Sequence, residues 1–173
     1  MAYRTLLTLG CAFLAITTLS SFQSKSATAE LHPTKGSKVK GKVTFTSVEE
    51  GGVRIVADIE GLSPGKHGFH VHEHGDCSAH NASSAGGHFN PDNKAHGAPN
   101  AAIRHVGDLG NIEADKNGHA HYDVVDHVIA LEGTNNIIDK AVIVHEKEDD
   151  FKTQPTGNAG EKVACGVIKE DPK

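Results

Sequence analysis

Several features that would place this 173-residue chain in a common class are missing from it. It contains no tryptophan, and acidic residues outnumber basic ones by 22 to 17, giving a formal net charge of −5. No basic stripe is present, so nucleic acid is not an expected partner. No apolar run reaches the roughly 20 residues that a stable membrane span needs. Internal repeats and long amphipathic helices are also absent, which leaves strands and turns to build one domain with a real core.

The first 29 residues predict a signal peptide, followed by a single domain over residues 30–173. Arg4 precedes an apolar, uncharged run over residues 5–19, and a polar stretch then reaches Ala27-Thr28-Ala29, a plausible cleavage motif. The alternative is an uncleaved membrane anchor. Because residues 1–29 hold Arg4 and Lys25 and no acids, their removal would change the net charge to −7.

Two points complicate this boundary. Cleavage after Ala29 would leave little chain for a first strand before Pro33. Cys11 is a poor match to a lipoprotein cleavage site, because the apolar run continues past it, so lipid anchoring through Cys11 is a secondary hypothesis. The main prediction is an exported protein, periplasmic or extracellular.

Only two cysteines follow this segment, Cys77 and Cys165. An even number of cysteines in an exported chain predicts a disulfide bond. The alternative is two free, buried thiols.

Alternation of apolar and polar residues predicts short β-strands over most of the chain. Residues 39–46 and 53–60 alternate on either side of a Glu-Glu-Gly-Gly turn, which is typical of a hairpin. Further strands are expected around residues 68–72 and over residues 120–124, 127–131, 140–145 and 163–168. About eight such strands predict an all-β antiparallel sandwich or barrel.

Two segments, residues 75–111 and 146–162, lack any regular period and are expected to be long loops. A loop of such length in a compact domain is normally functional or disordered, and metal ligands would order it.

Several histidines lie in the predicted strands and loops, in an arrangement that could bind metal ions. His70 and His72 are two residues apart in a predicted strand, so both imidazoles lie on one face while Phe69 and Val71 lie on the other. Histidine is the usual nitrogen ligand of copper and zinc, and a single carboxylate suits zinc. Six histidines and one aspartate form the candidate set: His70, His72, His88, His96, His105, Asp108 and His145.

The motifs around these residues resemble copper/zinc superoxide dismutase, in an exported, bacterial-like form, over residues 31–168. They occur in the order GFHVHE (68–73), GHFNP (87–91), KAHG (94–97), RHVGDLGN (104–111), VHE (144–146), GNAG (157–160) and ACG (164–166). This resemblance implies an eight-stranded antiparallel Greek-key barrel or flattened sandwich with two long functional loops.

The resemblance also implies one copper ion and one zinc ion per subunit. The implied copper ligands are His70, His72, His88 and His145. The implied zinc ligands are His88, His96, His105 and Asp108, so that His88 bridges the two ions. Asp149 is expected to accept hydrogen bonds from one histidine of each set, which would fix the orientation of the rings.

The implied reaction is dismutation of superoxide to dioxygen and hydrogen peroxide by a redox-cycling copper ion, with His88 as proton carrier and zinc in a structural role. Lys162 stands where the family usually places an arginine. Lysine keeps the positive charge but lacks the planar guanidinium, whose forked N–H groups can bind an anion through two hydrogen bonds. The alternative function is a module of the same fold that stores or delivers copper without turnover. The expected assembly is a monomer or a homodimer.

Overall fold

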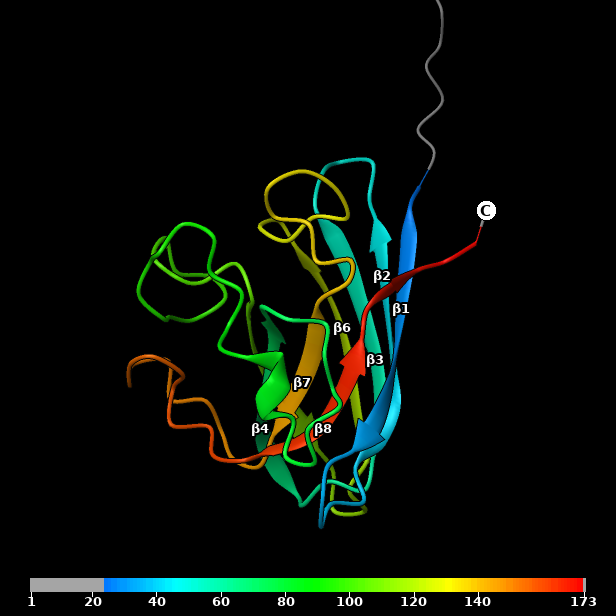
Figure 1. Ribbon diagram of the computed structural model, residues 1–173, viewed down its shortest axis with the longest axis vertical. Coiled ribbons are helices and arrows are strands. Elements are labelled where there is room, and N and C mark those ends of the chain that lie inside the picture. Colours follow the sequence, from blue (N-terminus) through cyan, green and yellow to red (C-terminus); the bar gives the residue numbers. More distant parts are fainter. Residues whose placement is uncertain (1–23, 173) are drawn as a thin grey trace, which may run out of the picture.

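The computed structural model of the protein describes residues 24–172 and consists of β-strands joined by turns and two long loops (Figure 1). Its regular elements are β1 (Ser26–Pro33), β2 (Lys40–Ser47), β3 (Val53–Glu60), β4 (Gly65–His72), a 3₁₀ turn η1 (Ser83–Ala85), β5 (Asp108–Ala114), β6 (Ala120–Asp126), β7 (Ala141–His145), β8 (Lys162–Val167) and β9 (Lys169–Glu170).

Eight of these strands close into an antiparallel barrel. The strand order is β2-β3-β6-β5-β4-β7-β8-β1, and β1 pairs back with β2, while the two-residue strand β9 adds to β1. Strands β6 and β5 lie between β3 and β4, and β5 and β4 lie between β6 and β7, so the connections β3–β4 and β6–β7 cross over two strands each, as in a Greek key. The expected all-β Greek-key barrel is confirmed.

The β2–β3 hairpin shows how the sequence pattern produces the barrel. Val43 pairs with Ala57 and Phe45 pairs with Ile55, and all four side chains are buried in the core. The residues between them, Thr44 and Val56, alternate away from the core and are only partly buried. Gly51 and Gly52 form the turn with φ values of 88° and 102°, which residues with side chains rarely adopt.

One strand prediction and one loop prediction are corrected by the structure. Residues 127–131 form turns with one isolated bridge at Ala130 instead of a strand, because the Asp126 carboxylate accepts the backbone N–H groups of Val128 and Ile129 and turns the chain. Conversely, β5 lies at the end of the segment predicted to be a loop, residues 75–111.

The structure covers only part of the N-terminal segment on which the signal-peptide prediction rests. Residues 1–23, which include Cys11 and most of the expected signal peptide, lie outside the described residues. Strand β1 begins at Ser26, and Ala27 and Ala29 are fully buried in the core. Within residues 24–172, no helix has the length and apolar character that crossing a membrane requires.

The two long loops position the candidate site. One joins β4 to β5 and the other joins β7 to β8, and both project from the same side of the barrel (Figure 1). The first loop is held against β4 by an antiparallel bridge between His72 and His88. As a result, the outward face of β4 is covered, and every residue from His67 to His72 is buried.

Candidate metal centre

The side chains of β4 alternate between two faces of the sheet, as the sequence pattern predicts. Phe69 and Val71 pack in the barrel core, whereas His70 and His72 lie on the other face, beneath the loops. This places two imidazoles on a rigid strand whose neighbours β5 and β7 hold its backbone by hydrogen bonds.

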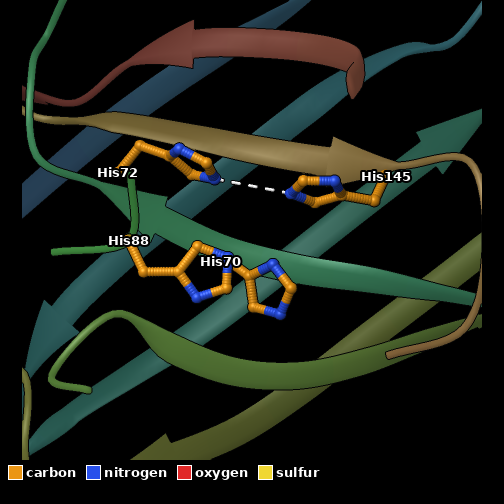
Figure 2. A group of neighbouring side chains, drawn as sticks. All are labelled: His70, His72, His88 and His145. Atoms are coloured by element: carbon orange, nitrogen blue, oxygen red, sulfur yellow. Dashed lines mark hydrogen bonds between the residues drawn. The ribbon is translucent and has the colours of Figure 1, made fainter. Parts of the chain in front are cut away.

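The first group of side chains consists of four buried histidines whose ligand nitrogens lie within 4.8 Å of one another (Figure 2): His70, His72, His88 and His145. His72 Nε2 and His145 Nε2 are 3.4 Å apart. The opposite nitrogens, His72 Nδ1 and His145 Nδ1, contact the carbonyl oxygens of Gly86 at 2.9 Å and Gly160 at 3.2 Å. Such contacts fix the tautomer, so that each Nε2 lone pair is directed toward the other rings.

Burial keeps the imidazoles of this group uncharged. It lowers the pKa of His72 and of His145 well below the usual 6.5, and together with His70 it lowers the pKa of His88 to about 4. At neutral pH these rings are therefore in the form that binds a metal ion.

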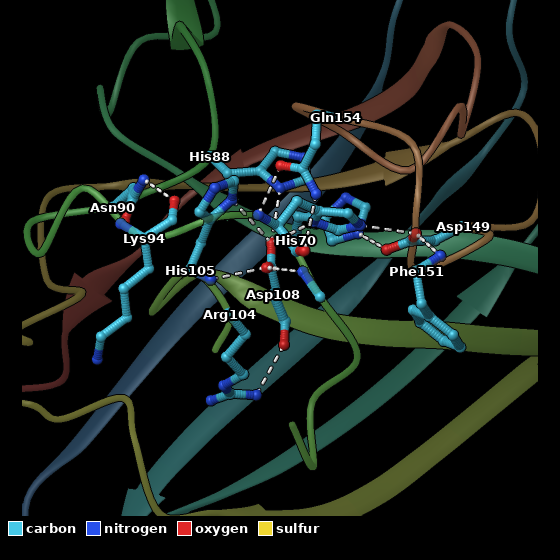
Figure 3. A network of polar contacts seen from close by, with 12 residues as sticks. His70, His88, Asn90, Lys94, Arg104, His105, Asp108, Asp149, Phe151 and Gln154 are labelled. Carbon is cyan, nitrogen blue, oxygen red and sulfur yellow. Dashed lines mark hydrogen bonds and ion pairs between the residues drawn. The ribbon is translucent and has the colours of Figure 1, made fainter. Parts of the chain in front are cut away.

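The second group contains His88, His96, His105 and Asp108, again with ligand atoms within 4.8 Å of one another. Three Nδ1 atoms surround one carboxylate oxygen of Asp108, at 2.7 Å for His88, 3.0 Å for His96 and 3.2 Å for His105. The other oxygen accepts the backbone N–H groups of His105 and Gly97, at 2.8 and 3.1 Å (Figure 3). Three nitrogens and one carboxylate oxygen form a donor set suited to zinc.

Four ring nitrogens of the two groups form no hydrogen bond of acceptable geometry, although two of them, His96 Nδ1 and His105 Nδ1, lie near the Asp108 carboxylate. They are His70 Nδ1, His88 Nε2, His96 Nδ1 and His105 Nδ1, all buried and all without a hydrogen-bond partner within residues 24–172. A buried polar atom left unpaired costs about 1–3 kcal/mol. Because each of them faces its own ligand group, a cation in each group would remove that cost. The residues therefore fit two metal ions, with His88 common to both.

Asp149 connects the two groups from outside. Its carboxylate oxygens lie 2.8 Å from His70 Nε2 and 2.9 Å from His96 Nε2 (Figure 3). Burial alone would raise the pKa of Asp149, but the hydrogen bonds from His70 and His96 outweigh it and hold that pKa well below its usual range. Asp149 is therefore ionised, and it orients one ring of each group.

Lys162 lies at the start of β8, beside the first group. Its ammonium donates to the carbonyl oxygens of Ala82 at 3.1 Å and Gly86 at 2.9 Å. The Gly86 carbonyl is the one that also contacts His72 Nδ1. Burial lowers the pKa of Lys162, while Glu161 and Glu73 oppose that shift.

The predicted disulfide is confirmed. Cys77 and Cys165 are bonded, with their Cα atoms 5.8 Å apart. The bond ties the loop that carries Gly86 to strand β8, three residues beyond Lys162.

Several supporting residues escaped prediction because their contacts are long-range. Gln154 holds the backbone of His96 through two hydrogen bonds, of 2.8 and 3.0 Å. Asn111 holds the backbone of Asp149 in the same way, at 2.8 and 3.0 Å. Arg104 donates to the Asp108 carbonyl oxygen at 2.8 Å and forms a buried ion pair with Asp126. No local sequence signal identifies an amide side chain that will clamp a backbone 38 or 58 residues away.

A β-barrel that buries two ligand groups sharing one histidine defines a class of protein, the binuclear copper and zinc metalloproteins. The sequence model of the family "Copper/zinc superoxide dismutase (SODC)" matches residues 39–168. An extracellular Cu-Zn superoxide dismutase of Drosophila melanogaster is 48% identical over 138 residues, covering 76% of each chain. The Cu-Zn superoxide dismutase of Paramecium bursaria Chlorella virus 1 is 51% identical, covering 75% of this chain and 72% of the viral one.

Two further comparisons agree. A Cu-Zn superoxide dismutase of Onchocerca volvulus is 44% identical over 144 residues, covering 78% of this chain and 90% of its own. A crystal structure of the clock protein EA4 superposes with a TM-score of 0.78 at 46% identity, covering 88% of this chain and 99% of that one.

The chain therefore belongs to the copper/zinc superoxide dismutase family. It is an oxidoreductase that dismutes superoxide to dioxygen and hydrogen peroxide, with copper and zinc as its cofactors. A copper-storing module without turnover is not favoured.

Proposed function

We propose that each subunit binds one copper ion through His70, His72, His88 and His145, and one zinc ion through His88, His96, His105 and Asp108. The observation that carries this assignment is the set of four buried, unpaired ring nitrogens, two in each group. The donor atoms would be Nδ1 of His70 and Nε2 of the other three histidines for copper. For zinc they would be the three Nδ1 atoms and one oxygen of Asp108.

Copper, when bound, supplies one-electron redox chemistry, and zinc supplies a fixed charge without redox activity. His88 is the proposed proton carrier of this site. Its Nδ1 lies 2.7 Å from Asp108, whereas its Nε2 is buried in the first group with no hydrogen-bond partner in the described part of the chain. That nitrogen can hold a proton beside the reacting oxygen while the ring stays fixed from its other side.

Lys162 is the proposed anion-orienting residue. Two of its three N–H groups are used by the carbonyl oxygens of Ala82 and Gly86, which leaves one for a bound anion. The chain as a whole is acidic and repels superoxide, so a local positive charge beside the ligand group is needed to attract it. The Cys77–Cys165 bond and the shared Gly86 carbonyl keep this ammonium at a fixed position relative to His72.

We further propose that the protein is exported, to the periplasm or beyond the cell, after removal of an N-terminal signal. The disulfide and the extracellular Drosophila relative support export. Cleavage after Ala29 would remove the first half of β1, whose Ala27 and Ala29 are fully buried, so we place the cut at or before Ser26.

Mass spectrometry of the exported protein tests this boundary. A mature chain that starts at Glu30 would contradict it, and a lipid-modified chain that starts at Cys11 would establish the anchored alternative. The mature protein is expected to be a monomer or a homodimer, and analytical ultracentrifugation distinguishes the two.

The proposed metal assignment is tested by loading the purified protein with copper and zinc and following superoxide decay after pulse radiolysis. We expect catalytic decay proportional to copper content, and none from the metal-free protein. Full occupancy of both ions without catalytic decay would refute the assignment of this centre as the reacting site.

A further inference from the structure

The outer face of β3 and β6 carries two histidines that the metal centre does not use. His121 lies on β6 and His119 directly precedes that strand, so the two are two residues apart, the same spacing as His70 and His72 on β4. Both are exposed, as the sequence predicted, and neither belongs to the buried ligand groups. Although β6 begins only at Ala120, both imidazoles line the same surface hollow.

Two carboxylates lie opposite these histidines on β3. Asp58 pairs directly with His121, and Glu60 and His119 lie one position beyond the adjoining Ile59–Ala120 pair. Directly opposed side chains in an antiparallel pair have Cβ atoms about 4.5–5.5 Å apart. All four side chains line one surface hollow. The hollow therefore brings together two imidazoles and two carboxylates.

One histidine of this set is already oriented. His121 Nδ1 lies 2.7 Å from Asp58 Oδ1, which directs Nε2 away from the carboxylate and toward solvent. A carboxylate on the far nitrogen is the arrangement that commonly supports a metal-binding histidine. The backbone of His119 is held by Asp115, whose carboxylate accepts the His119 N–H at 3.0 Å and whose N–H donates to the His119 carbonyl at 2.8 Å.

We propose that His119, His121 and Glu60, with Asp58 orienting His121, form a second, surface site for a divalent cation of the zinc and copper class. Imidazole nitrogen with carboxylate oxygen is the donor set such ions prefer. The ligand atoms do not converge as they stand, so binding requires His119 to turn toward His121. Exposed side chains change rotamer in picoseconds to nanoseconds, so this rearrangement is fast. Glu60 must also release the ammonium of Lys40, which lies 2.9 Å away. The two form an exposed ion pair, which contributes little stability.

Zinc titration of the holoenzyme tests the proposal. Protein already saturated with copper and zinc is titrated with Zn²⁺ by isothermal calorimetry, and the histidine ring signals of the reduced enzyme are followed by NMR. We expect one further zinc ion per subunit, a third metal equivalent, that shifts the rings of His119 and His121. The ring of His127, an exposed histidine directly after the other end of β6, is expected to stay unchanged.

Variants give the matched comparison. His119→Gln combined with His121→Gln should abolish the third equivalent, while His127→Gln should retain it. Asp58→Asn should weaken it at least tenfold, as loss of an orienting carboxylate does elsewhere. Superoxide decay should be unchanged in all of these proteins. A holoenzyme that binds no third equivalent, or a double variant that binds it as tightly as the parent, would overturn the proposal.

Discussion

Replacing Lys162 by arginine changes how many hydrogen bonds an anion can receive beside the proposed copper ligands. The ammonium has three donors, and the carbonyl oxygens of Ala82 and Gly86 take two of them. A guanidinium has five donors in a planar fork, so three remain after the same two contacts, and two of these can bind one anion. The substitution therefore adds one charge-assisted hydrogen bond to a bound anion.

That additional bond is worth about 1.5 kcal/mol, which corresponds to roughly tenfold in a binding constant. We expect Lys162→Arg to be inhibited by azide at about one tenth of the concentration that inhibits the parent. The superoxide decay rate should change less, because the net charge that attracts the substrate is the same. Pulse radiolysis with an azide titration measures both, and Lys169→Arg, at an exposed lysine of β9, is the control.

The same variant has a pH signature. Burial lowers the pKa of Lys162 below the ordinary lysine value of 10.5, and the ammonium is the form that attracts superoxide. Activity should therefore fall as the pH rises through that lowered pKa. A guanidinium stays protonated beyond about pH 12, so in Lys162→Arg the fall should move to higher pH. Unchanged azide inhibition together with an unchanged alkaline midpoint would refute the role given to Lys162.

Three further substitutions probe the supports of the site. Asp149→Asn removes the carboxylate between the two ligand groups, and we expect about 10–100-fold weaker zinc binding in chelator competition; an unchanged affinity would show that the link is dispensable. Cys77→Ser with Cys165→Ser opens a closed loop of 88 residues, which should lower the free energy of unfolding by about 4–5 kcal/mol in denaturant titrations. Gly157→Ala would push a methyl group into the Asp149 carboxylate and weaken zinc binding, whereas Gly36→Ala, also at positive φ but without neighbours among the described residues, should not; equal zinc loss in both variants would contradict the contact.

The fold was predictable where local pattern and tertiary environment agree. The β2–β3 hairpin follows from its alternation, and His70 and His72 could be placed on one face of β4 because a strand has a period of two. Prediction failed where a side-chain contact overrides the local pattern. Residues 127–131 have the composition of a strand, but the Asp126 carboxylate captures two of their N–H groups and is itself held by Arg104.

The candidate site shows the same division. The ligand residues carry recognisable motifs, so their grouping was predictable from the resemblance to a family. Strand β5 was hidden because it starts at Asp108, directly after a loop rich in Gly, Ala, Asn and His. The contacts of Lys162 with the carbonyl oxygens of Ala82 and Gly86 depend on how the disulfide-linked loop lies against β8, and backbone acceptors leave no trace in side-chain identity.

As the residue common to both ligand groups, His88 is proposed to join the two metal ions through its two ring nitrogens. The direct measurement is the electron paramagnetic resonance spectrum of the protein with Cu²⁺ in the copper site and Co²⁺ in place of zinc. If the ring bridges the ions, exchange coupling should remove the ordinary Cu²⁺ signal, and His88→Ala should restore it at equal metal content. An uncoupled Cu²⁺ signal from the parent protein at full occupancy of both sites would contradict the bridge.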